Sequence, residues 1–143
     1  MSSIQYHERV GLRKLWWVGP LVIVAVAIAN LIIRTIAVAF FGVSEAFQLL
    51  QAPTLIGSTI IYVVLALLAF LLVGRFARRP IRFYRVLALV ALCVSFLTPV
   101  MALTGLLPTP GMNVHIFGTM IVMHIVSAII VVGLFITLTR QQA

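Results

Sequence analysis

Residues 55–73 read LIGSTIIYVVLALLAFLLV, a run of 19 residues without a charged side chain. A transmembrane helix needs about 20 consecutive apolar residues to cross the hydrocarbon core of a bilayer. Four runs in the chain meet this need: about Leu15–Phe41, Leu55–Val73, Phe83–Leu103 and Val114–Leu138. Each run has to be helical, because a span in lipid must satisfy its own backbone hydrogen bonds. We therefore predict an all-α fold, a bundle of four transmembrane helices.

The composition predicts one integral membrane domain. Of 143 residues, 64% are hydrophobic and 8% are charged, whereas a soluble domain is about half apolar and a quarter charged. The four runs leave no room for a separate globular domain, so residues 1–143 are expected to form a single four-span domain. The first run extends past the length of a signal-peptide core, and we expect an uncleaved first span. Cys93 is the single cysteine, which excludes an intramolecular disulfide and a cysteine-based metal cluster.

The cations predict the direction of the bundle. The formal net charge is +8, and nine of the ten Lys and Arg residues lie at one side of the predicted spans. They are Arg9, Arg13, Lys14, Arg75, Arg78, Arg79, Arg82, Arg85 and Arg140. The positive-inside rule assigns this side to the cytoplasm, so we expect both termini on the cytoplasmic face of a cell (inner) membrane. The five arginines in residues 75–85 are predicted to contact anionic lipid, and nucleic acid is not an expected partner.

The first outer connection has the pattern of a short amphipathic helix. Its apolar and polar residues fall on different helical faces: Val43, Phe47 and Leu50 against Glu45, Gln48 and Gln51. This pattern predicts a short helix that lies flat in the membrane interface.

Polar side chains gather in the outer half of the predicted spans. Arg34 lies in the outer third of the first span, with Asn30 one turn deeper on the same face. We predict that four polar faces turn inward and line a pocket open to the outer side, which binds a small amphiphilic or anionic ligand such as a lipid, a quinone or a carboxylate. The predicted ligand-binding residues are Asn30, Arg34, Glu45, Tyr62, Ser95, Thr98, His124 and Ser127.

Arg34 is the one cation inside a predicted span. A charge at the centre of a span costs at least about 2.5 kcal/mol and commonly marks a function or a partner. Glu45 is the only acid outside the N-terminal tail, so a structural Arg34–Glu45 pair is one interpretation. Snorkelling of Arg34 to the outer head groups is a second interpretation, and binding of an anion is a third.

His124 is the histidine that lies deepest in the predicted membrane. It could contact a ligand, move a proton, or bond to a neighbouring helix, for instance at the Ser95 carbonyl that Pro99 leaves without its usual amide donor. His115 lies nine positions away, about 180° round the helix, which argues against a bis-histidine haem. We predict no cofactor and no metal site.

Binding without catalysis is the favoured function. The predicted spans hold no pair of carboxylates, and Ser95 and Ser127 lack the adjacent base and orienting acid that a serine nucleophile needs. The purely aliphatic inner half argues against transport. The alternative is a structural or accessory subunit of a larger membrane complex, in which the polar faces meet another membrane protein or a second copy of the chain.

Short motifs along nearly the whole chain resemble a group of small bacterial four-helix integral membrane proteins of unknown function. The motifs are the basic N-terminus with Trp16-Trp17, Asn30 and Arg34, Arg79-Pro80, Ser95 and Pro99, and Met123-His124. The resemblance implies a four-helix bundle in a bacterial cytoplasmic membrane. It implies no reaction and no ligand.

Overall fold

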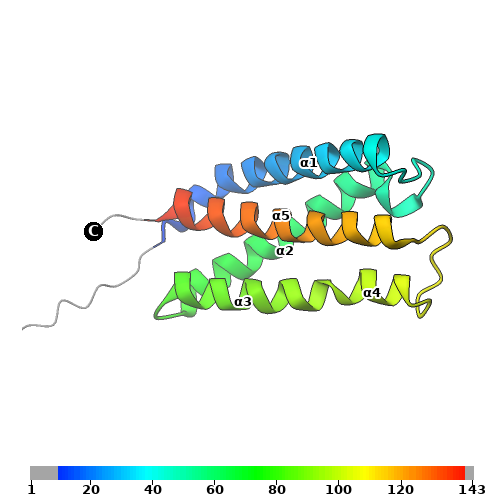
Figure 1. Ribbon diagram of the computed structural model, residues 1–143. Coiled ribbons are helices and arrows are strands. Elements are labelled where there is room, and N and C mark those ends of the chain that lie inside the picture. The colour runs from blue at the N-terminus through cyan, green and yellow to red at the C-terminus, as the bar shows by residue number, and fades with distance from the viewer. Residues whose placement is uncertain (1–9, 141–143) are drawn as a thin grey trace, which may run out of the picture.

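The computed structural model describes residues 10–140, which form four helical rods (Figure 1). The helices are α1 (Leu15–Phe40), α2 (Ala52–Phe76), α3 (Pro80–Ser95), α4 (Leu97–Leu103) and α5 (Val114–Thr139), with two short 3-10 turns, η1 (Leu12–Lys14) and η2 (Gln48–Leu50). Helix α4 continues α3, so that four rods are long and apolar enough to cross a membrane. The predicted all-α, four-span fold is confirmed, and these features indicate a multi-pass membrane protein.

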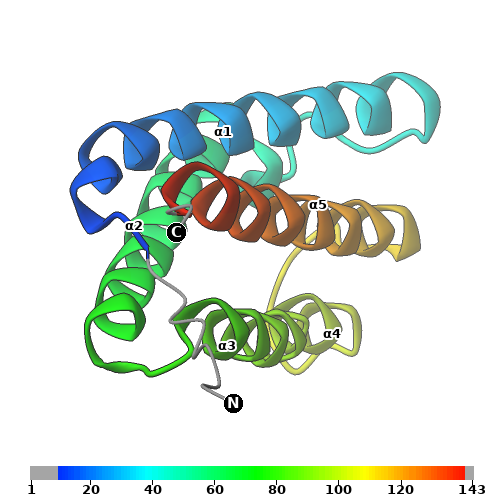
Figure 2. The ribbon, with the colours of Figure 1, turned by 90° about the vertical axis from the view of Figure 1, so that its left-hand side faces the viewer.

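The four rods do not pack evenly on one another. Helices α1 and α5 lie side by side, whereas α2 slants across the bundle, with its C-terminal end beside α3 and its N-terminal end beside α1 (Figures 1 and 2). Helix α4 packs on α5. The rods therefore close around a common core at one end, and α2 and α4 diverge toward the other end.

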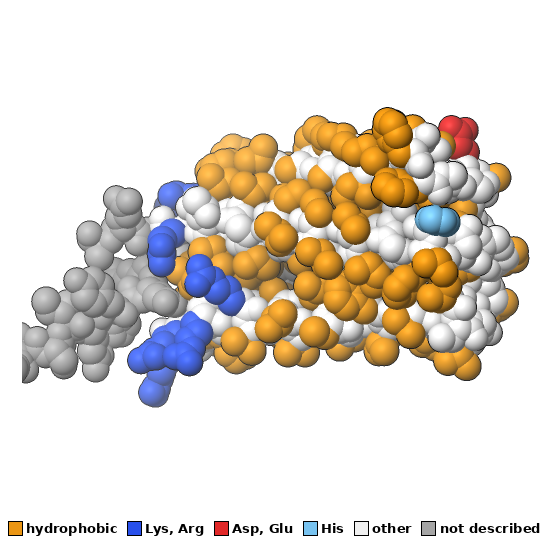
Figure 3. Space-filling model, viewed as in Figure 1, with side chains coloured by type: hydrophobic (Ala, Val, Ile, Leu, Met, Phe, Trp, Pro, Cys, Tyr) orange, Lys and Arg blue, Asp and Glu red, His pale blue; other side chains and the backbone are white. Residues whose placement is uncertain are grey.

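The two ends of the bundle differ in charge (Figure 3). One end, which we call the arginine-rich end, carries eight exposed cations: Arg13, Lys14, Arg75, Arg78, Arg79, Arg82, Arg85 and Arg140. Arg9, which was expected on the same side, lies outside the described residues. Here the amide of Gly11 also donates to the carbonyl of Thr139 (2.7 Å), so the chain enters and leaves the bundle at this end. The other end, which we call the opposite end, holds the loops that follow α1 and α4.

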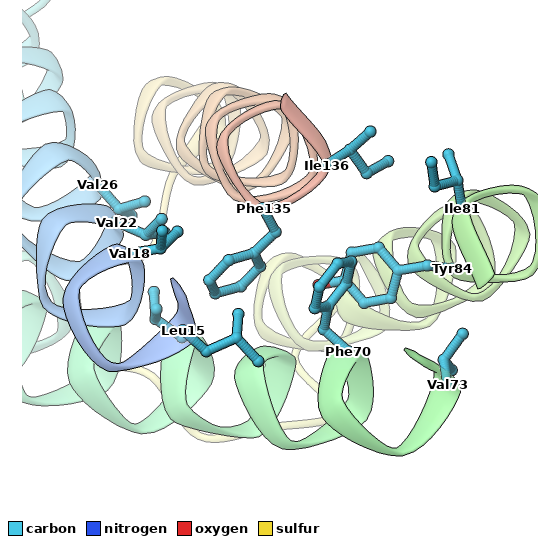
Figure 4. Packing of buried hydrophobic residues seen from close by; sticks show 11 residues of the cluster. Leu15, Val18, Val22, Val26, Phe70, Val73, Ile81, Tyr84, Phe135 and Ile136 are labelled. Atoms are coloured by element: carbon cyan, nitrogen blue, oxygen red, sulfur yellow. The ribbon is translucent and has the colours of Figure 1, made fainter. Parts of the chain in front are cut away.

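An aromatic cluster closes the bundle in its arginine-rich half (Figure 4). Phe70 of α2 has its ring centroid 4.8 Å from that of Tyr84 on α3 and 5.5 Å from that of Phe135 on α5. Leu15 and Val18 of α1 are buried in the same core. All four rods thus contribute to one core, whose rings meet edge to face and in a stack, the arrangements that favour aromatic pairs.

The third rod is interrupted at Phe96, between α3 and α4. Pro99 has no amide hydrogen to donate to the carbonyl of Ser95, and a proline inside a helix breaks the hydrogen-bond ladder in this way. The hydroxyl of Ser95 donates to the carbonyl of Leu92 (2.6 Å) on its own helix.

The predicted interfacial helix is a single 3-10 turn, η2. Helix α1 ends where Gly42 adopts a left-handed conformation (φ 65°) and the amide of Val43 donates back to the carbonyl of Ala37. The residues on either side of η2, Phe47 and Gln51, are extended, which limits the helix to one turn. The predicted faces nevertheless agree with the structure: Val43, Phe47 and Leu50 are buried, and Glu45, Gln48 and Gln51 are exposed.

Candidate functional site

A buried hydrogen-bonded network joins three helices in the opposite half of the bundle. The side-chain amide of Asn30 on α1 donates to the hydroxyl of Thr59 on α2 (3.3 Å), and its carbonyl oxygen accepts from the hydroxyl of Ser127 on α5 (3.2 Å). We call these three residues the Asn30 cluster. Polar side chains that bond across helices in this way hold transmembrane helices together. The cluster therefore ties α2 and α5 to α1 one turn below Arg34.

Arg34 is half-buried and is held by the connection that follows α1. Its Nε donates to the backbone carbonyl of Leu50 in η2, at 2.6 Å. A short bond from a charged donor to a carbonyl is stronger than a neutral one, so it fixes the plane of the guanidinium. No acceptor within residues 10–140 bonds to the two terminal amino groups of Arg34.

The structure does not contain the Arg34–Glu45 pair that was one interpretation of the sequence. Glu45 is exposed, and no ion pair within the described residues joins it to Arg34. The reason is that the connection folds its apolar residues, Phe47 among them, onto the bundle and turns its polar residues outward. Within residues 10–140 there is no other carboxylate, so no described acid balances the charge of Arg34.

His124 bonds to its own helix. Its Nδ1 lies 2.7 Å from the carbonyl of Met120, and its ring centroid lies 6.2 Å from that of Phe96. The carbonyl of Ser95, considered as a partner from the sequence, is not the acceptor that the structure shows. Because a carbonyl can only accept, Nδ1 carries the proton, and in the neutral ring Nε2 is left as an acceptor.

The other predicted ligand-binding residues do not join the Asn30 cluster. Tyr62 is 68% exposed and Thr98 is exposed. Ser95 is half-buried, with its hydroxyl bonded within α3. On α2 the inward face runs through Thr59, which the sequence-based prediction of the site omitted. The spacing of Thr59 with Val63 and Phe70, both buried, is the signal that could have identified it.

Two of the hollows on the described surface lie away from these polar residues. One, of about 470 Å³, lies between the end of α2 and the start of α3, with Phe76, Arg79 and Phe83 among its walls. The other, of about 400 Å³, lies between α1 and α5 beside Ala25 and Gly133. None of the eight predicted ligand-binding residues lines either hollow, so ligand binding by them stays a prediction.

Chemical groups for a metal site are sparse in residues 10–140, which contain no group of three or more His, Cys, Asp or Glu side chains placed to hold an ion. Comparisons of the chain with protein-family models, with curated proteins and with solved structures find no match. Function therefore has to be argued from the arrangement of the side chains.

Proposed function

We propose that this protein binds a small amphiphile with an anionic head group, and that Arg34 holds the head group. The observation that carries the proposal is a half-buried guanidinium, fixed by the Leu50 carbonyl, without a carboxylate partner among the described residues. A cation within a span is costly unless it is paired. An anion supplied by a ligand would balance the charge, and the planar guanidinium matches a carboxylate or a phosphate.

The depth of Arg34 favours an amphiphile over a free anion. Arg34 lies six residues before the end of α1, about 9 Å along the helix axis. The exposed side chains around it on α1 include the apolar Ile32 and Ile36. A head group at this depth would be followed by an apolar tail along these side chains.

The Asn30 cluster would act as a positioning element for Arg34. It fixes α1 against α2 and α5 one turn below, while η2 fixes the guanidinium itself. By the positive-inside rule, the opposite end would face the outer side of a cell membrane. The proposed ligand would then enter from the outer leaflet.

Native mass spectrometry of the protein in dodecyl maltoside, titrated with dodecyl phosphate, tests the proposal. With Arg78→Gln/Arg79→Gln in every protein, which removes two exposed cations at the arginine-rich end, we expect one bound dodecyl phosphate. Its affinity should fall about tenfold or more in Arg34→Gln, because a charge-assisted hydrogen bond is lost. Arg13→Gln, which removes an exposed cation at the arginine-rich end, is the matched control and should keep this binding event. Unchanged affinity in Arg34→Gln would refute the proposal.

Arg34→Lys separates recognition by the guanidinium from simple attraction to lipid. A lysine keeps the charge and can extend to the head groups, but it lacks the planar pair of donors. Binding as tight as that of the wild type in Arg34→Lys would mean that the charge alone attracts the anion. A loss close to that of Arg34→Gln is the result that supports a site built around the guanidinium.

A role as an accessory subunit is the second candidate, and the α3–α4 rod favours it. In its most apolar stretch 11% of the residues are buried, against 22% in each of the other three rods. An exposed surface of this kind could dock another membrane protein. The substitution Ala91→Trp on this rod should release a bound protein subunit from the gently solubilised complex, and Leu65→Trp on the exposed side of α2 should not.

A further inference from the structure

A groove opens in the angle between α2 and α3 at the arginine-rich end. Helix α2 ends at Phe76 and α3 begins at Pro80, so only three residues connect the two antiparallel helices. The groove, of about 470 Å³, has Val73 and Ala77 as its floor. Val73 is buried and Ala77 is half-buried, so these two side chains close the bottom of the groove.

The polarity of the groove changes along the bundle axis. Leu72 of α2 and Phe83 of α3 line its inner part, and both are exposed to the surroundings. Arg78 and Arg79 line its mouth. Leu72 lies four residues before Phe76, the last residue of α2, which places it about 6 Å inside the end of the helix, whereas Arg78 and Arg79 lie beyond that end. A phospholipid has the same sequence of groups, an acyl chain followed by a phosphate.

The positive charge around the groove favours a lipid with an anionic head group. Five arginines lie within residues 75–85, all of them exposed, and Glu45, the one acid among residues 10–140, belongs to the opposite end. Arginine binds phosphate through its planar donors, and juxtamembrane cations attract anionic head groups. A net negative head group therefore fits the mouth of the groove better than a zwitterionic one.

We infer that this groove binds one anionic glycerophospholipid of the surrounding bilayer, with its phosphate at Arg78 and Arg79 and an acyl chain between Leu72 and Phe83. The inference is independent of the proposed function, because the two sites lie at opposite ends of the bundle. It differs from diffuse attraction of lipid to the arginine-rich end in one respect. The groove holds the lipid by its walls as well as by its charge.

Native mass spectrometry of the full chain with added phosphatidylglycerol tests the inference, with phosphatidylcholine of the same acyl chains as the reference lipid. All variants carry Arg34→Gln, so that the proposed site at Arg34 does not contribute. Adding Arg78→Gln/Arg79→Gln should lower the affinity of the first bound phosphatidylglycerol on the order of tenfold. The matched control is Arg13→Gln/Lys14→Gln, which removes the same charge from exposed positions at the same end but outside the groove. Its affinity should fall by less than about threefold.

The substitution Ala77→Leu keeps every charge and fills the floor of the groove. It should lower the affinity for phosphatidylglycerol by about fivefold, because the added side chain occupies space that the lipid would fill. Equal losses in the two charge variants, or full affinity in Ala77→Leu, would show diffuse attraction and overturn the inference. Equal binding of phosphatidylcholine and phosphatidylglycerol by the wild type would overturn it as well. Because all of these variants lack the Arg34 guanidinium, failure here leaves the proposed function standing.

Discussion

The two halves of the bundle are held together by different side chains. In the arginine-rich half, α2, α3 and α5 meet through the rings of Phe70, Tyr84 and Phe135, and α1 packs on them with aliphatic side chains. In the opposite half, α1, α2 and α5 are joined by the Asn30 cluster and by a second apolar core without stacked rings, and α4 packs on α5. Lipid tails are as apolar as the helices, so packing and hydrogen bonds have to supply the association. We therefore expect the larger part of the stability from the aromatic half, and we place the proposed binding site in the polar half.

The largest effect is expected from the centre of the aromatic half. Phe135 has none of its side chain exposed, and Phe135→Ala should lower the free energy of unfolding by about 3–5 kcal/mol because it leaves a cavity. Denaturant titration in mixed micelles would measure the loss. Phe40→Ala is the control, since Phe40 is 79% exposed. An equal loss of unfolding free energy in Phe135→Ala and Phe40→Ala would show that the aromatic half is not the main source of stability.

A smaller loss is expected in the polar half. Asn30→Leu removes both hydrogen bonds of the Asn30 cluster and should lower the free energy of unfolding by about 1–2 kcal/mol. Thr98→Val, at an exposed position, is the control. A double-mutant cycle with Ser127→Ala should show that the two residues are coupled. Additive losses would mean that the hydrogen bond between them contributes nothing measurable.

Tyr84→Phe sharpens the comparison because it removes a hydrogen bond from the aromatic half and keeps the ring. The hydroxyl donates to the carbonyl of Ala66 over 3.3 Å. Its loss should cost about 0.5–1 kcal/mol, less than the loss of the Asn30 cluster. A larger cost than that of Asn30→Leu, measured by the same titration, would show that hydrogen bonding also dominates the aromatic half.

The sequence predicted the elements of this fold well because lipid imposes simple rules on it. Run length and charge placement located α1 and α5 to within a residue at each end, and α2 to within three. On α1 the inward face was also predicted, since Asn30 and Arg34 mark it against an apolar background. The short interfacial helix was located by its separate apolar and polar faces, although it is only one turn long, and the apolar Phe47 and Leu50 are buried.

The rotation of α2 and of the α3–α4 rod could not be predicted in the same way. A membrane helix is apolar on the lipid side and on the core side, so hydrophobic periodicity does not distinguish the two. The polar residues Tyr62 and Thr98 were taken as markers of the inward face, and both are exposed. The partners of Arg34 and His124 are backbone carbonyls, which no side-chain pattern reveals.

The most direct test is the gain in unfolding free energy that dodecyl phosphate gives to three proteins in dodecyl maltoside. All three carry Arg78→Gln/Arg79→Gln, so that the groove does not contribute to binding. The first has no further change, the second adds Phe135→Leu and the third adds Arg34→Gln. At a ligand concentration of about a hundred times Kd, the first two should each gain about 2.7 kcal/mol, although Phe135→Leu starts from a lower stability. The Arg34→Gln protein should gain about 1.4 kcal/mol or less, because its affinity is expected to be at least about tenfold weaker. An equal gain in all three, or a gain lost with Phe135→Leu instead of Arg34→Gln, would contradict the division into a stabilising half and a binding half.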